Sequence, residues 1–130
     1  MAKKIKKMFM NQLIRPNHRY RKFMEILDSQ EITEILKPLI SDNPCRGFGL
    51  LRLFKALFLQ VLEDLRDREL EVFLEENNAG KWFCGFNWGE KTPDYSLFSK
   101  IRKKIGERRC ANIFINAEIR SKPKGLGTKS

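Results

Sequence analysis

Between Phe48 and Leu62 the chain is apolar on nearly every side of a helix, and its large apolar residues after Phe48 are Leu50, Leu51, Leu53, Phe54, Leu57, Phe58, Leu59, Val61 and Leu62. A helix without a polar face needs neighbours packed around it, so this segment is predicted to be the central core helix. It covers about 15 residues and carries Arg52, Lys55 and Gln60, whereas a membrane span needs roughly 20 apolar residues. We therefore expect no membrane partner.

Apolar residues elsewhere also recur with helical spacing, and no run alternates apolar and polar residues for long enough to predict a strand. Proline, glycine and short polar residues stand where helices start and stop. Besides the core helix, helices are predicted over Pro16 to Leu27, from a Ser29 cap to Ile40 with a bend at Pro38, from Asp67 to Asn77, from Thr92 to Gly106, and from Glu107 to about Ile119. The predicted fold is all-α, a compact multi-helix bundle without a sheet.

The length of 130 residues and the 42% hydrophobic content fit one buried core. We assign residues 16–119 to this helical domain. Residues 1–15 are predicted to form a basic, partly disordered arm, and residues 120–130 have the composition of a disordered tail.

The chain carries 26 Lys and Arg against 16 Asp and Glu, a formal net charge of +10, which favours a polyanionic partner. No acid occurs between Met1 and Lys22, and cations return between Lys100 and Arg109. The segment from Glu63 to Asn78 between them is acidic, and we expect it to form a solvated face that phosphates repel. Nucleic acid is therefore the first candidate partner.

The helix opened by Thr92-Pro93-Asp94 has an apolar side and an opposite polar side of Ser96, Ser99, Lys100 and Lys103. Short hydroxyls that reach base edges and lysines that hold phosphates suit a helix in the DNA major groove, although the same pattern also fits a solvated amphipathic face. The acidic helix before it suggests a helix-turn-helix-like arrangement, but the connector is longer than usual, so a short inserted helix or a plain bundle is expected. The candidate DNA-binding residues are Ser96, Ser99, Lys100, Lys103, Lys104, Arg108, Arg19, Arg21 and Lys22.

Other possible sites have simpler explanations. The aromatic run from Trp82 to Trp88 could stack on unpaired RNA bases, but core packing is favoured because these rings bury large areas. The three cysteines are far apart, and the only histidine, His18, lies among cations, so neither a metal nor a cofactor is expected. Asn11 and Gln12 interrupt the apolar run that a signal peptide would need, which predicts a cytoplasmic protein.

Five blocks of the chain occur in an order and spacing that resemble a known family. They are LFKALFLQ at 53–60, LRDRELE at 65–71, KWFCG at 81–85, TPDYS at 92–96 and FSKIRKKIG at 98–106. Over roughly residues 16–106 the chain is similar to the N-terminal domain of InsH-type transposases, the insertion sequence five group of DDE transposases.

The resemblance implies a role in DNA transposition. In that family the N-terminal helical domain is thought to bind the terminal inverted repeats of double-stranded DNA, and an RNase H-like domain with three magnesium-binding carboxylates follows. We expect that catalytic domain to be absent here, so that the chain is a truncated fragment without enzymatic activity or a small-molecule substrate. Alternatively, the fragment could pair with itself or with full-length transposase and inhibit it, or be the inert product of a degenerate gene.

Overall fold

The computed structural model describes residues 11–39 and 48–121, and within these ranges the chain forms helices and turns without a strand. The described part of the chain contains no helix with both the length and the apolar character needed to cross a membrane. The helices are α2 (Arg19–Leu27), α3 (Gln30–Leu36), a 3-10 turn (Lys37–Leu39), α4 (Leu50–Leu62), α5 (Asp67–Glu76), α6 (Asn78–Cys84), α7 (Tyr95–Ile105) and α8 (Glu107–Ser121). The all-α prediction is confirmed.

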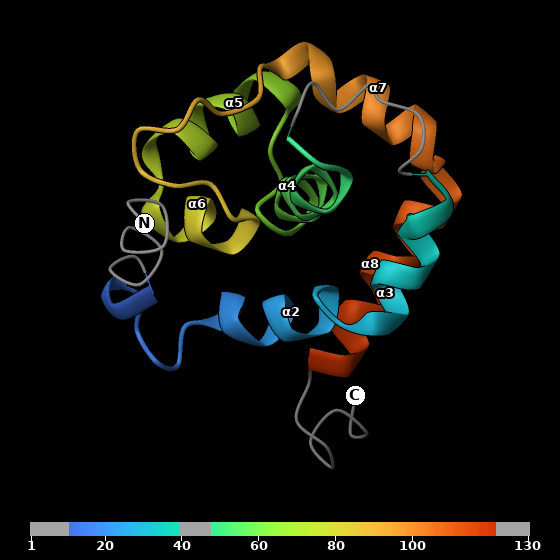
Figure 1. Ribbon diagram of the computed structural model, residues 1–130, viewed down its shortest axis with the longest axis horizontal. Helices are drawn as coiled ribbons and strands as arrows, with labels where there is room; N and C mark the ends of the chain where they lie inside the picture. Colours follow the sequence, from blue (N-terminus) through green and yellow to red (C-terminus); the bar gives the residue numbers. More distant parts are fainter. Residues whose placement is uncertain (1–10, 40–47, 122–130) are drawn as a thin grey trace.

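Helix α4 lies at the centre of the fold, and the other helices surround it (Figure 1). An unbroken run of α4, from Leu53 to Leu59, is buried. The Phe58 ring lies 4.9 Å from the ring of Phe23 in α2, 6.0 Å from that of Phe83 in α6 and 5.3 Å from that of Phe114 in α8, measured between centroids. The prediction of a core helix packed on all sides is confirmed.

The helix boundaries follow local capping groups. Ser29 caps α3 through its hydroxyl oxygen, and the chain tightens into the 3-10 turn at Pro38, both as predicted. Helix α2 begins at Arg19 and not at Pro16, because the Nδ1 atom of His18 accepts the Tyr20 amide at 3.1 Å and makes His18 the N-cap.

The later helices also begin and end at identifiable groups. The carboxylate of Asp94 caps α7. Gly106 ends α7 with a φ of 97°, a conformation that glycine adopts without strain. Helix α8 continues through Ser121, two residues beyond the predicted end, so that Arg120 belongs to the fold and not to the predicted tail.

The aromatic run after α5 is part of the core. Residues Asn78–Cys84 form the short helix α6, and Trp82, Phe83 and Phe86 are buried. Gly85 ends α6 in the left-handed conformation and lets the chain turn back toward the core. Core packing is therefore confirmed for these rings, which are not available as platforms for unpaired bases.

Part of the predicted N-terminal arm is packed against the fold. Asn11–Leu13 are helical, and Ile14 is buried in the core. The Arg21 guanidinium donates to the carbonyl oxygens of Asn11, Ile14 and Arg15 at 2.6–2.8 Å. Residues 1–10 of the arm, residues 122–130 of the tail and Cys45 lie outside the described residues.

Helices α4, α5 and α7 are joined by a polar cluster. Both guanidinium nitrogens of Arg102 bind the Asp67 carboxylate, at 2.8 and 2.9 Å, and Gln60 of α4 hydrogen-bonds to both residues. Glu63 at the end of α4 accepts hydrogen bonds from Arg19 and Tyr20. The prediction of a solvated acidic face is thus wrong for Glu63 and Asp67, which hold helices together.

The central position of Phe58 predicts a large cost for its truncation. Phe58→Ala should lower the free energy of unfolding by about 3–5 kcal/mol, because it leaves a cavity where three helices meet. Val61→Ala is the control, since Val61 lies on the same helix with 55% of its surface exposed, and it should change stability by less than about 0.5 kcal/mol. Urea unfolding measures both, and equal costs would contradict the central role of Phe58.

The Arg102 pair predicts a pH-dependent stability. Hydrogen bonds from Arg102 lower the pKa of Asp67, so its stabilisation is present at neutral pH and is lost as the pH falls through the folded-state pKa. Asp67→Asn should therefore destabilise the fold by about 1–2 kcal/mol at pH 7, and by progressively less in acid. Glu75→Gln, at an exposed carboxylate of the same helix, should show no such trend in urea unfolding followed from pH 7 to pH 3.

Candidate nucleic-acid interface

The outer face of α7 carries two exposed cations. Leu97, Phe98, Ile101 and Ile105 point into the core, and Lys100 and Lys103 lie exposed on the other side. Within residues 11–39 and 48–121, neither lysine forms an ion pair. Arg102, between them in sequence, binds Asp67 instead. The positive charge of the two lysines therefore remains available to an anion in solvent.

Of the two serines of α7, Ser96 has a structural role that the site prediction did not include. The Ser96 hydroxyl donates to the Asp94 carboxylate at 2.5 Å, and the Ser96 amide donates to the same oxygen at 3.0 Å. This bonding makes Ser96 part of the helix cap, a role that its position two residues after Asp94 could have suggested. Ser99 is half-buried beside the exposed lysines.

Cations continue around the corner at Gly106 into α8. Lys104 is half-buried, whereas Arg108 is exposed. Arg108 lines a groove together with Arg109, Asn112, Asn116, Ile105 and Ile35. Sequence reasoning missed Asn112 and Asn116, although exposed amides four residues apart on one helix face, after two arginines, were a readable signal.

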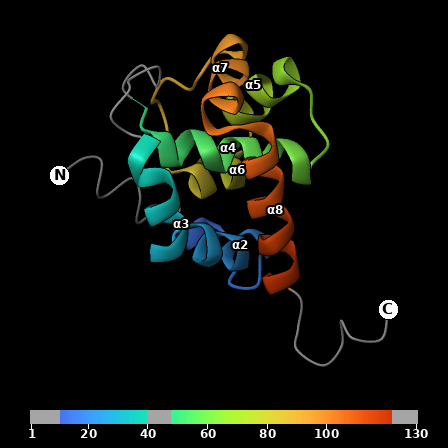
Figure 2. The ribbon, with the colours of Figure 1, turned by 90° about the vertical axis from the view of Figure 1, so that its right-hand side faces the viewer.

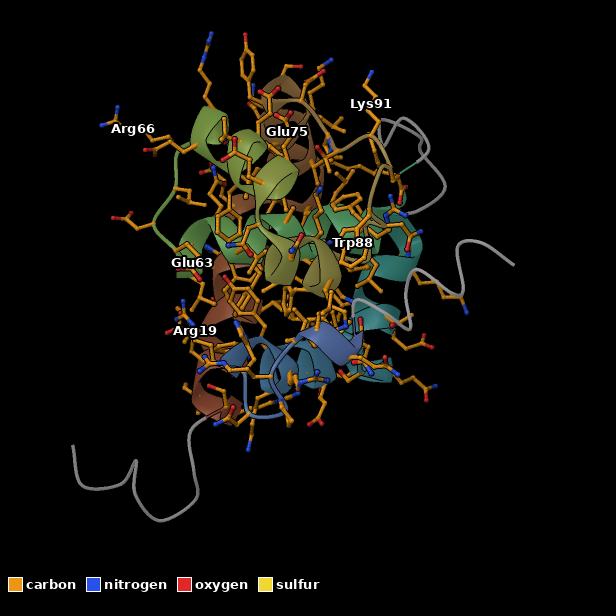
Figure 3. The ribbon with its side chains drawn as sticks, turned by 90° about the vertical axis from the view of Figure 1, so that its left-hand side faces the viewer. Arg19, Glu63, Arg66, Glu75, Trp88 and Lys91 are labelled. Atoms are coloured by element: carbon orange, nitrogen blue, oxygen red, sulfur yellow. The ribbon has the colours of Figure 1, made fainter. Side chains whose placement is uncertain are left out.

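The predicted site residues of α2 have partners within the protein. Arg19 forms an ion pair with Glu63 at 2.5 Å, and Figure 3 shows these two side chains together at one side of the molecule. Arg21 is committed to backbone carbonyls and lies 4.8 Å above the Trp82 ring. Lys22 is exposed. Arg19 and Arg21 thus have structural roles that the sequence did not indicate.

The two groups of predicted site residues lie at opposite ends of the fold. Helix α7 lies at one end and α2 at the other, with α4 between them, and both views agree (Figures 1 and 2). Helix α8 runs from its junction with α7 to its contact with α2. The structure therefore does not bring Arg19, Arg21 and Lys22 together with Lys100 and Lys103.

The titratable groups of the described residues show the local electrostatics. Burial lowers the pKa of His18, and Arg15, Arg19 and Arg21 lower it further. Burial raises the pKa of Cys84 to about 12 and that of Cys110 to about 11, which keeps both free thiols protonated. Among the described residues, no three His, Cys, Asp or Glu side chains cluster closely enough to hold a metal ion.

Comparison with known proteins assigns most of the chain to a family. Residues 8–104 match the family described as Transposase domain (DUF772), which covers more than half of the 130-residue chain. No curated protein matches the chain, and no solved structure does. The matched region contains α2 to α6 and nearly all of α7, including Lys100 and Lys103. The chain therefore belongs to the transposase domain family DUF772.

Proposed function

We propose that this protein is a DNA-binding domain of an InsH-type insertion-sequence transposase, and that it recognises terminal inverted repeats through the outer face of α7. The observation that carries this proposal is that one cation of α7 is paired within the protein and two are exposed. Arg102 forms an ion pair with Asp67, whereas Lys100 and Lys103 are exposed to solvent. Two exposed lysines on one helix face are suited to backbone phosphates.

The arrangement of α5 and α7 supports major-groove binding. Helix α5 packs against α7 at Tyr95 and Arg102 and leaves Lys100 and Lys103 exposed, as the first helix of a helix-turn-helix packs against the recognition helix. Helix α6 and the following loop are inserted between them, so the arrangement is helix-turn-helix-like with a long connector. An α-helix with its side chains is about 10–12 Å across, a diameter that suits the major groove, which is about 12 Å wide.

The start of α8 offers side chains that can distinguish bases. Arginine pairs with guanine and asparagine with adenine through two hydrogen bonds each in the major groove. Arg108, Asn112 and Asn116 line one groove and are exposed. We assign sequence-independent affinity to the lysines of α7 and base recognition to these α8 residues, with Ser99 as a further contact.

We propose that the described residues bind DNA and do not catalyse a reaction. We also propose that this binding takes place in the cytoplasm. The acids near α7 support this assignment, because Asp67 is bound by Arg102, Glu71 accepts the Tyr95 amide and Asp94 caps α7. Each of these carboxylates has a structural partner, so none needs a metal ion to explain its position.

A second function is favoured by one observation on α8. Ile115 and Ile119 lie one turn apart on its outer face and are 58% and 61% exposed. Exposed aliphatic residues at this spacing are suited to pairing with another helix, in a second copy of this chain or in another transposase chain, which such pairing would inhibit.

DNA binding by α7 predicts a specific salt dependence. Lys100→Ala with Lys103→Ala should weaken binding to a terminal-repeat duplex and lower the slope of log affinity against log salt by about two, since two phosphate contacts are lost. Lys37→Ala with Lys91→Ala removes the same charge at exposed positions outside α7 and should leave the slope nearly unchanged. Fluorescence anisotropy at several salt concentrations measures both, and an unchanged slope in the α7 variant would contradict the assignment.

Self-association through α8 predicts a different result. Ile115→Ser with Ile119→Ser should shift any dimer to monomer in light scattering while DNA affinity per monomer stays the same, because neither side chain lies in the core. Val61→Ser with Val72→Ser is the matched control at exposed aliphatic positions elsewhere. A parent protein that is monomeric at all accessible concentrations, with and without DNA, would rule out this second function.

A further inference from the structure

The end of the fold opposite α7 carries a basic depression of its own. It is lined by Pro16, Asn17, His18, Arg19, Arg21, Lys22, Phe23, Glu25, Leu62 and Ser121. We call these residues, together with the exposed Arg15, the α2 surface. Arg15, Arg19 and Lys22 are exposed to solvent there. The depression is open, so it is suited to a partner's surface more than to an enclosed small molecule.

Cations outnumber acids on the α2 surface. Among the described residues, the acids beside Arg15, Arg19, Arg21 and Lys22 are Glu25, the neighbouring Glu63 and, on the far side of Arg21, Asp28. Glu63 pairs with Arg19, but the oxygens bound by Arg21 belong to neutral groups, three backbone carbonyls and the Asn11 side-chain amide. Arg21 thus forms no ion pair within residues 11–39 and 48–121, and the surface keeps a positive excess.

The pKa of His18 indicates that the electrostatic potential at this surface is positive. Arg15, Arg19 and Arg21 each lower its pKa, in addition to the larger effect of burial, and Glu63 is the acid that opposes them. Lys22 and Glu25 line the same depression. The imidazole thus lies where positive charge prevails over negative charge, and an anion bound there would reverse the electrostatic effect on it.

The first and last described residues, Asn11 and Ser121, lie beside or in this surface. Asn11 is held by Arg21, and Ser121 lines the depression. The residues before Asn11 include Lys3, Lys4, Lys6 and Lys7, those after Ser121 include Lys122, Lys124 and Lys129, and neither segment contains an acid. The sequence that adjoins these two residues is therefore also basic.

These observations point to a second polyanion site. Building on the proposed binding of DNA by α7, we propose that the α2 surface holds the phosphate backbone of a separate DNA duplex, so that one copy of the chain contacts two duplex segments at once. The chemistry is charge pairing with phosphates, a kind of contact that does not depend on base sequence. The α7 and α8 residues supply the sequence-dependent contact at the other end.

The unique histidine allows a direct test. The pKa of His18 is measured by NMR with and without excess duplex of unrelated sequence, at low salt, in the parent and in the Lys100→Ala, Lys103→Ala variant. Phosphates at the α2 surface should raise the pKa of His18 in both proteins. A His18 pKa that does not respond to DNA in a parent that binds DNA would overturn the proposal.

Bridging of two duplexes provides the second measurement. Duplexes labelled with an energy-transfer donor and others labelled with an acceptor are mixed with the full chain. The parent should bring them together, whereas Arg15→Gln with Lys22→Gln should bind duplex without bridging. These substitutions leave the Arg19–Glu63 pair and the Arg21 hydrogen bonds intact, so the fold should persist. Lys37→Gln with Lys91→Gln, the charge-matched control, should bridge as the parent does.

The outcomes separate this proposal from the binding of DNA by α7. If α7 does not bind DNA, the Lys100→Ala, Lys103→Ala variant binds as the parent does, and the α2 variant loses all binding. If α7 binds DNA but the α2 surface does not, the Arg15→Gln, Lys22→Gln variant still bridges the duplexes. Bridging then arises from self-association of protein copies that each bind one duplex. A His18 pKa that responds to an acidic polypeptide but not to duplex would assign the surface to a protein partner and overturn the proposal.

Discussion

The burial of α4 on all sides is the constraint on which the rest of the fold depends. Its apolar residues contact α2, α6 and α8 through Phe58 and Phe54, and its three polar side chains are each used as a link to a different element. Lys55 pairs with Asp28 at the end of α2, Arg52 with Glu90 after α6, and Gln60 with the Asp67–Arg102 cluster. Helix α4 thus positions every helix that carries a candidate site residue, either by direct contact or through one intervening helix.

Local patterns predicted the helices well because their causes are local. The apolar spacing of α7, the Ser29 cap and the Gly106 stop depend on residues within one or two turns. Ion pairing between distant segments could not be predicted in this way. Glu63 and Asp67 resemble Glu75 in sequence, yet Glu63 lies beside Arg19 and Asp67 beside Arg102, 44 and 35 residues away.

The same limit applies to the candidate site. Arg21 and Lys22 are adjacent cations with equivalent sequence signals, but Arg21 faces Trp82 and the carbonyls of residues 11–15, whereas Lys22 faces solvent. On α7, Arg102 and Lys103 differ in the same way. The planar guanidinium of Arg102 matches the two oxygens of Asp67, and lysine, a compact point charge, lacks this geometry. On α7, residue type together with helix side therefore separates the structural Arg102 from the available Lys103.

The separation of the two basic surfaces also limits how DNA can be held. Helix α8 contacts α7 at one end and α2 at the other, and its 15 residues span about 22 Å at 1.5 Å per residue. One straight duplex on the outer face of α7 cannot also reach α2 on the far side of α4 (Figure 2). Bending a single short site around the domain would cost on the order of several kcal/mol in DNA deformation. Since a second duplex needs no such deformation, the rigid spacing set by α4 and α8 favours two separate segments over one wrapped segment.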